Sequence, residues 1–144
     1  MTCVVGLVHR GTVYIGADSA GVAGWDLTVR ADQKVFHNGP FLFGFTTSFR
    51  MGQLLRYSLV PPQHDPTVEV ERYLATAFMD AVRACLKDGG FASKQNEQES
   101  GGNFLIGYQG QLFEIGSDYQ VGRPVDEFAA VGCGAQIALG AMAV

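Results

Sequence analysis

The sequence lacks several features that would place it in other classes of protein. It has no apolar run of 18 residues, so no membrane-spanning helix is predicted, and no basic leader with an apolar stretch, so no signal peptide is expected. Its three cysteines are odd in number and far apart, which favours a reducing compartment, by default the cytosol, over a disulfide framework. A net charge of −4 argues against surfaces for nucleic acid or anionic membranes.

Motifs for cofactor binding are also missing. The histidines show neither a metalloprotease motif nor Cys/His ligand spacing, and the paired glycines fit no phosphate-binding loop. The sequence therefore predicts no metal site and no other cofactor.

What is present is a pattern of strands, two helices, more strands and a final helix. We expect strands over 3–8, 13–15, 29–36, 41–45, 103–108, 111–115 and 128–131, with loops over 19–28 and 91–102. Helices are expected over 48–60, from 65 or 67 to 88, and from 135 onward. The strands do not alternate cleanly, which implies cover on both faces. One domain (1–144) of the α+β class is therefore expected, a four-layer αββα sandwich of two antiparallel sheets.

The first eighteen residues are the most informative stretch. They predict a hairpin whose first strand begins at the second residue, so the chain end would be fixed although termini usually fray. If Met1 is removed, Thr2 carries a hydroxyl and a free amine, which together form a known nucleophile–base pair. By position alone, Thr2 is an ordinary strand residue.

Together with other motifs, this start resembles the N-terminal nucleophile (Ntn) hydrolases, specifically the proteasome β-subunit and its bacterial ring-peptidase relatives. That family places an aspartate sixteen and a lysine thirty-two positions after its nucleophile, and Thr2, Asp18 and Lys34 meet both separations. The resemblance extends through 44–48 and 131–134 and covers essentially the whole chain.

The resemblance implies a role for each residue. Thr2 Oγ would attack an amide carbonyl to give an acyl-enzyme, with its own amine as base. Lys34 would disfavour protonation of that amine and stabilise the developing alkoxide, and Asp18 would keep Lys34 charged and oriented. The oxyanion donor would be the backbone N–H of Thr47, although the family carries glycine there.

Further residues depart from the family pattern or allow a second interpretation. Cys133 stands where relatives carry serine, and it is either part of the site or a structural cysteine like Cys85. Cys3 would be the nucleophile after loss of two residues, or a packed core thiol. The family also continues beyond this chain's last residue with elements that support the nucleophile's amine, so C-terminal elements are expected to be missing. A substrate pocket is expected beside three residues, Gly21, Asp32 and Phe45.

Three functional hypotheses follow. The first is a threonine-type peptidase that acts on peptide or protein substrates as a ring or another homo-oligomer, with an ATP-dependent unfoldase as a candidate partner. The second is a catalytically silent assembly subunit with the same fold, favoured by Thr47 and by the early chain end. The third keeps the mechanism and takes a small amide as substrate.

Overall fold

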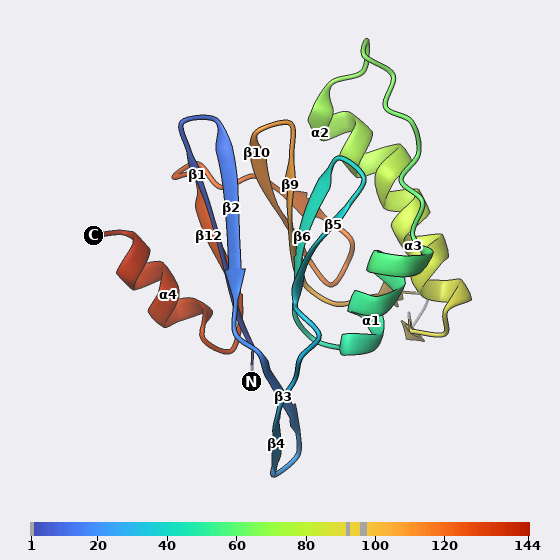
Figure 1. The fold of residues 1–144 in the computed structure, drawn as a ribbon. Helices are drawn as coiled ribbons and strands as arrows, with labels where there is room; N and C mark the ends of the chain where they lie inside the picture. Colours follow the sequence, from blue (N-terminus) through green and yellow to red (C-terminus); the bar gives the residue numbers. More distant parts are fainter. Residues whose placement is uncertain (1, 92, 96–97) are drawn as a thin grey trace.

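Two antiparallel sheets stack face to face, with helices on both outer sides (Figure 1). The computed structural model of the protein describes residues 2–91, 93–95 and 98–144. The first sheet has the order β12-β1-β2, and the second has the order β11-β10-β9-β6-β5. Their strands are β1 (Cys3–His9), β2 (Thr12–Ala17), β5 (Val35–Asn38), β6 (Phe41–Phe45), β9 (Phe104–Tyr108), β10 (Gln111–Ile115), β11 (Val121–Gly122) and β12 (Phe128–Gly132). The predicted four-layer αββα arrangement is thus confirmed.

The two sheets approach each other closely because glycines lie at the contact. A Cβ on Gly44 would come within 2.6 Å of the Val4 side chain, and one on Gly107 within 2.8 Å of Val13. A small apolar cluster fills the rest of this interface. The second sheet is therefore covered on both faces, which explains why its strands are apolar without alternation.

The larger core lies between the second sheet and the helices α1 (Phe49–Gln53), α2 (Val70–Tyr73) and α3 (Met79–Asp88). Aromatic rings dominate it, and Phe41 stacks on both Phe78 and Tyr108 with centroid distances of 4.5 and 4.2 Å. π-helical segments continue α1 and α2, namely η1 (Leu54–Ser58) and η2 (Leu74–Phe78). The outer face of the first sheet is covered by α4 (Ala135–Met142), which packs on β12 and β1.

The helix boundaries follow local signals. Ser48 caps α1, since its hydroxyl accepts from the backbone N–H groups of Arg50 and Met51, as predicted. The second helical segment ends at Gly89, as expected from the glycine pair, but it begins at Val70 rather than at residue 65 or 67. The Asp65 carboxylate instead accepts from the Thr67 backbone and hydroxyl, which forms a local turn.

Two segments predicted as loops contain hairpins instead. Residues 19–28 largely form β3 (Ala20–Ala23) and β4 (Asp26–Val29), joined by a turn with Gly24 at φ 62°, and this hairpin projects from the body (Figure 1). Residues 91–102 contain the short hairpin β7 (Ser93–Gln95) and β8 (Gln98–Ser100). Both predictions were wrong because backbone hydrogen bonds hold these strand pairs together. Such pairing does not require the apolar alternation by which a strand is recognised in a sequence.

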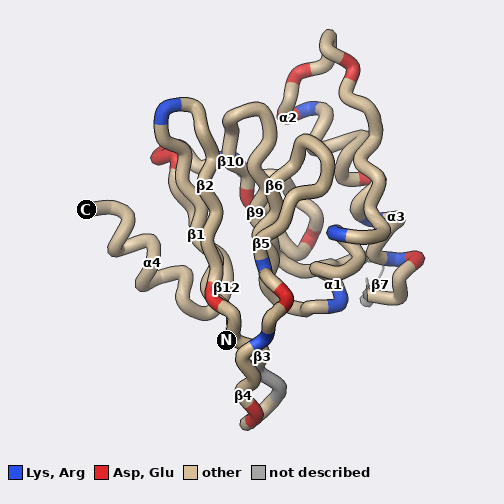
Figure 2. Tube along the Cα trace, in the orientation of Figure 1, with Lys and Arg blue, Asp and Glu red and all other residues tan. Residues whose placement is uncertain are grey.

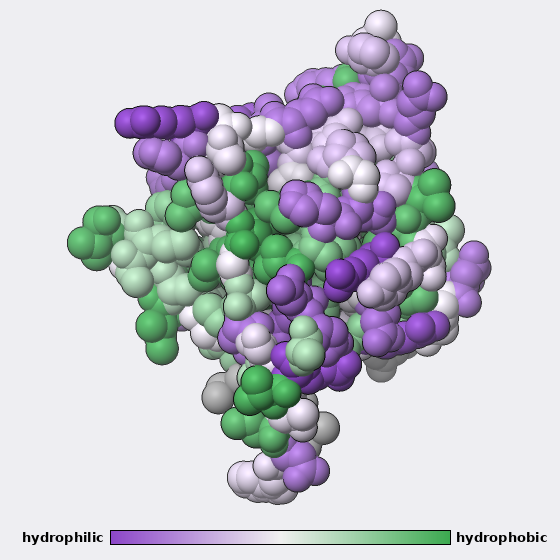
Figure 3. All heavy atoms as spheres, viewed as in Figure 1, coloured by the Kyte–Doolittle hydropathy of each residue, from purple (hydrophilic) through white to green (hydrophobic). Residues whose placement is uncertain are grey.

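Charged and apolar side chains are unevenly distributed. Figure 2 shows both signs of charge where β2, β3 and β5 meet, whereas α4 carries none. Apolar side chains gather on α4 and on the β3–β4 hairpin (Figure 3), and Trp25, Leu27, Val29 and Ile137 are exposed. None of the described helices is long and apolar enough to cross a membrane.

Candidate active site

Three residues predicted from the sequence to share a site lie together at the ends of strands. Thr2 directly precedes β1, Asp18 directly follows β2, and Lys34 directly precedes β5. The β1–β2 hairpin brings its two open ends together, because the Asp18 amide donates to the Cys3 carbonyl at 3.2 Å. The Asp18 carboxylate in turn accepts from the Cys3 amide at 2.9 Å.

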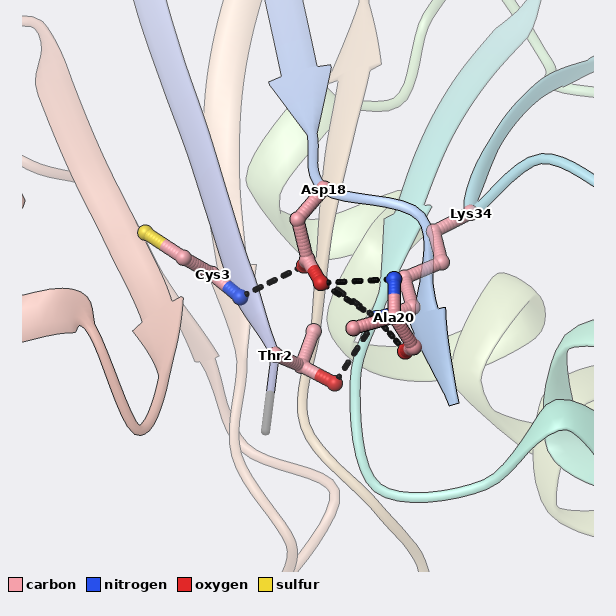
Figure 4. A network of polar contacts seen from close by, with 5 residues as sticks. All are labelled: Thr2, Cys3, Asp18, Ala20 and Lys34. Atoms are coloured by element: carbon pink, nitrogen blue, oxygen red, sulfur yellow. Dashed lines mark hydrogen bonds and ion pairs between the residues drawn. The ribbon is translucent and has the colours of Figure 1, made fainter. Parts of the chain in front are cut away.

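The Lys34 ammonium is the centre of the cluster (Figure 4). Its Nζ lies 3.1 Å from Thr2 Oγ1, 3.1 Å from both Asp18 carboxylate oxygens and 2.6 Å from the Ala20 carbonyl. The Lys34 side chain is 2% exposed. An ammonium has three hydrogens to donate, and a hydroxyl, a carboxylate and a carbonyl receive them here. The buried charge is therefore paired and held in one geometry.

The Asp18 carboxylate is kept ionised by its surroundings. Burial disfavours its charged form, but hydrogen bonds from the Cys3 and Ala20 backbone amides and from Lys34, together with the charge of Lys34, lower its pKa below the ordinary value. The Ala20 amide donates to Oδ2 at 2.9 Å. Asp18 therefore fixes the start of β1, the start of β3 and Lys34 at once.

The turn after β12 fixes the backbone of Thr2. Gly132 has φ 99°, and a Cβ at this position would lie 2.1 Å from the Thr2 carbonyl oxygen, so only glycine fits. The Gly134 amide donates to the same carbonyl oxygen at 3.3 Å. Sequence reasoning placed Gly132 in a tight turn but did not predict its contact with Thr2.

Thr47 adopts the left-handed backbone conformation, with φ 70°. Threonine rarely adopts this conformation, and here side-chain hydrogen bonds hold it: Thr47 Oγ1 accepts from the Asn103 amide at 3.2 Å and lies 3.0 Å from Thr46 Oγ1. Among the described residues, the Thr47 backbone N–H has no hydrogen-bond acceptor. A backbone donor is therefore available at a cavity that Thr2 also lines, in a conformation that usually favours glycine.

A cavity of about 360 Å³ opens beside these groups. Its lining comprises Thr2, Ala20, Gly21, Lys34, Phe45, Thr46, Thr47, Ser48, Phe49, Asn103, Gly132 and Cys133. Of the three residues expected to bind substrate, Gly21 and Phe45 line this cavity and Asp32 does not. The Asp32 carboxylate instead forms two hydrogen bonds of 2.7 Å with Arg30 and lines a neighbouring cavity. That ion pair holds the pKa of Asp32 below its ordinary value.

The three cysteines are free thiols in different environments. Cys133 is exposed and lines the cavity, which of the two alternatives favours a place in the site over a structural position like that of Cys85. Cys85 is partly buried and its thiol donates to the Leu54 carbonyl at 3.4 Å, while burial raises its pKa. The Cys3 side chain points away from Lys34 (Figure 4), which leaves it without the neighbour that a nucleophile needs.

No group of three metal-binding side chains occurs among the described residues.

Comparison with known proteins identifies the fold. No protein-family model matches the chain, and no curated protein is similar to it in sequence. Among solved structures, BPH from Thiobacillus denitrificans in complex with epoxomicin superposes with a TM-score of 0.79 at 20% identity, over 98% of this chain and 77% of that one. HslV from Trypanosoma brucei gives a TM-score of 0.60 at 16% identity, over 96% and 76%.

A third solved neighbour is the Anbu (Gly-1) mutant from Hyphomicrobium sp. strain MC1, with a TM-score of 0.60 at 19% identity, over 92% of this chain and 61% of that one. The fold is therefore that of the Ntn hydrolases. Among Ntn-type folds it is the proteasome β-subunit-like one, as the sequence predicted.

Proposed function

We propose that this protein is a threonine-type amide hydrolase, with Thr2 as the nucleophile once Met1 is removed. One observation supports this most directly: the buried ammonium of Lys34 donates to Thr2 Oγ1 at 3.1 Å while the Asp18 carboxylate holds it in place. A hydroxyl at the edge of a cavity, beside a fixed positive charge, is arranged for attack on a carbonyl.

In the proposed reaction, the free α-amine of Thr2 takes the hydroxyl proton, and Oγ bonds to the amide carbon. An ordinary α-amine has a pKa of about 7.7–8.0, so roughly a fifth to a third of it is neutral near pH 7.4. Lys34 favours the neutral amine and stabilises the developing alkoxide. The departing amine of the substrate takes the proton as the C–N bond breaks, and water then hydrolyses the ester to release the acid and restore Thr2.

The negative oxygen of the tetrahedral intermediate needs a donor, and we assign this role to the Thr47 backbone N–H. Its support is the positive φ of Thr47, which the contacts with Thr46 and Asn103 maintain. Such a donor contributes about 3–4 kcal/mol of transition-state stabilisation. Cys133, in the same cavity lining, is proposed to contact the bound substrate.

We further propose that the substrates are peptides and that the chain self-associates. The peptidase-type fold supports the first point. Support for the second comes from the exposed apolar side chains of β4 and α4, together with the helical assembly of the neighbouring Anbu complex from Pseudomonas aeruginosa. An intracellular location agrees with three free thiols.

The decisive experiment is mass spectrometry of the purified protein before and after an epoxyketone or β-lactone probe. We expect Met1 to be absent and the probe to be attached to Thr2. Thr2→Ala and Lys34→Ala should lose labelling, whereas Lys87→Ala, which removes an exposed lysine of α3, should keep it. Retained Met1 would refute the proposal, and a folded, trimmed, oligomeric protein without labelling or turnover would favour the silent assembly subunit.

A further inference from the structure

The turn that joins β6 to α1 has a rare backbone conformation. The Ser48 amide donates to the Thr46 carbonyl at 2.7 Å, which closes a three-residue turn around Thr47. Since Thr47 has φ 70°, this is the γ-turn with a positive central φ, the rare and strained form. Both Thr46 and Thr47 line the Thr2 cavity. Contacts from outside the turn must therefore hold it in this conformation.

The two threonine hydroxyls form a ring of hydrogen bonds with the backbone of Asn103. The Asn103 amide donates to Thr47 Oγ1 at 3.2 Å, the two hydroxyl oxygens lie 3.0 Å apart, and Thr46 Oγ1 donates to the Asn103 carbonyl at 2.9 Å. Because Thr46 gives its only hydroxyl hydrogen to Asn103, the hydrogen between the two hydroxyls comes from Thr47. Each hydroxyl therefore donates once and accepts once, and the ring starts and ends on Asn103.

This ring is anchored in the second sheet and partly shielded from water. Asn103 directly precedes β9, and its carbonyl also accepts from the Thr46 amide at 3.1 Å. Thr46 is 5% exposed. The segment before Asn103 is fixed as well, since the Gly101 amide donates to the Ser117 carbonyl at 2.8 Å. Hydrogen bonds that are shielded in this way are strong and costly to lose.

Gly102 provides the space that the Thr47 side chain occupies. A Cβ on Gly102 would lie 2.8 Å from Cβ and from Oγ1 of Thr47, and 2.8 Å from Met51 Sδ. The φ of Gly102 is not positive, so its backbone conformation does not require glycine, whereas its contact with Thr47 does. Glycine is thus replaced at residue 47, where the backbone favours it, and is found instead at residue 102, where the threonine needs room.

We propose that the hydroxyls of Thr46 and Thr47 position the Thr47 N–H as oxyanion donor, and that Gly102 makes room for this arrangement. A glycine at residue 47 would permit the conformation, whereas the hydrogen-bonded threonine enforces it. This inference rests on the proposed function, and it adds two positioning residues, Thr46 and Gly102, that act through Thr47. The donor meets a full negative charge only as the tetrahedral intermediate forms, so loss of the ring should lower kcat more than it changes KM.

The first test compares substitutions of Thr47 in the Met1-trimmed protein, with the best fluorogenic peptide amide found for the wild type. Thr47→Val keeps the shape of the side chain without its hydroxyl, so kcat should fall about 10²-fold or more. Thr47→Gly should lose less, and Thr47→Ser, which keeps the hydroxyl, should be at least about tenfold faster than Thr47→Val. KM should change less than about threefold. Thr76→Val removes a hydroxyl that donates to the Arg72 carbonyl and does not line the cavity, so kcat should stay unchanged.

A second set of variants addresses the two residues that act through Thr47. Thr46→Val removes the acceptor of the Thr47 hydroxyl and should lower kcat at least about tenfold, and Thr46→Ser should restore most of that loss. Gly102→Ala should lower kcat at least about tenfold in the wild type. In the Thr47→Gly background the further loss should stay below about threefold, because only the end of the Met51 side chain must then move.

Amide hydrogen exchange separates this inference from the proposed function, because it needs no turnover. Measured by NMR on folded protein, the Asn103 amide should exchange at least about tenfold faster in Thr47→Val and Thr47→Gly than in wild type and Thr47→Ser. If this order holds while the wild type hydrolyses nothing, the ring is supported and only the proposed activity fails. Equal exchange in all four proteins, or equal kcat for Thr47→Val and Thr47→Ser, would overturn the inference.

Discussion

Two hydrogen-bonded clusters of partly or fully buried polar side chains differ both in composition and in surroundings. One is the Lys34 cluster with Thr2 and Asp18. In the other, the His64 cluster, the imidazole Nδ1 lies 2.8 Å from the Tyr108 hydroxyl, Nε2 lies 2.7 Å from the Val68 carbonyl, and the ring stacks on Tyr73 at 4.2 Å.

The difference lies in where each network ends. In the His64 cluster, Nε2 donates to the Val68 carbonyl and Nδ1 pairs with the Tyr108 hydroxyl, and none of these residues lines the Thr2 cavity. The network around Lys34 ends on a hydroxyl that faces a cavity. A polar network whose partners are all internal therefore stabilises the fold. A network that ends on a hydroxyl facing a cavity can also take part in a reaction.

The largest effect is expected from a substitution that breaks the Lys34 cluster. Lys34→Met keeps the apolar length of the side chain and removes the charge beside Thr2, so probe labelling and peptide hydrolysis should fall about 10³-fold or more. Asp18 keeps its two backbone donors and is 34% exposed on its side chain, so the fold should survive. Labelling rates by mass spectrometry and circular dichroism check both points. A labelled variant at the wild-type rate would contradict the assignment, and Lys87→Met is the matched control.

Gly132→Ala should have the next largest effect. The new Cβ meets the Thr2 carbonyl oxygen at 2.1 Å, so Thr2 must shift, and a misplacement of about 1 Å costs roughly 10²-fold in rate. Labelling kinetics measure the loss. Gly140→Ala in α4, where a Cβ meets nothing within 4 Å, should label normally. Equal rates for the two variants would show that the Thr2 backbone need not be fixed.

The opposite behaviour is expected for the His64 cluster. Tyr108→Phe removes the hydroxyl that pairs with His64 Nδ1 and should lower the free energy of unfolding by about 1–3 kcal/mol. Labelling of the folded variant should match wild type, because the cluster does not touch the cavity. Urea unfolding and labelling below the midpoint measure the two quantities. A drop in labelling without a drop in stability would show that the clusters are coupled.

Acid should weaken the Lys34 cluster through Asp18. Its folded pKa lies below its unfolded value, so the stabilisation is present above the unfolded pKa and is lost as pH falls through the folded one. Wild type should therefore lose more stability than Asp18→Asn between about pH 5 and pH 2. Thermal unfolding across this range measures the difference. Parallel curves for the two proteins would show that Asp18 does not carry this effect.

The Lys34 cluster was predicted from the resemblance, which supplies the separations between Thr2, Asp18 and Lys34. The β1–β2 hairpin explains one part of it, because its register puts Asp18 beside Cys3, next to Thr2. Strands β6, β9 and β10 were predicted with little error because tight turns and apolar runs bound them.

Other features depend on contacts that leave no local signal. The stacking of Arg30 on Phe49 joins residues distant in the chain, and Asp32, which pairs with Arg30, lines the cavity next to the one that contains Thr2. The β3–β4 hairpin was missed because side chains such as Trp25 are exposed, so the sequence has no alternation of buried and exposed residues there. The positive φ of Thr47 is likewise held by Asn103, a residue distant in the chain.

The contact of Gly132 with the Thr2 carbonyl has a consequence for the order of events during synthesis. Thr2 is positioned by β12 and the turn after it, which are synthesised well after Thr2 itself. Until that late strand docks beside β1, the chain start lacks its backbone support on one side. A chain that has not yet added β12 therefore lacks the contact that holds the Thr2 hydroxyl in register with Lys34.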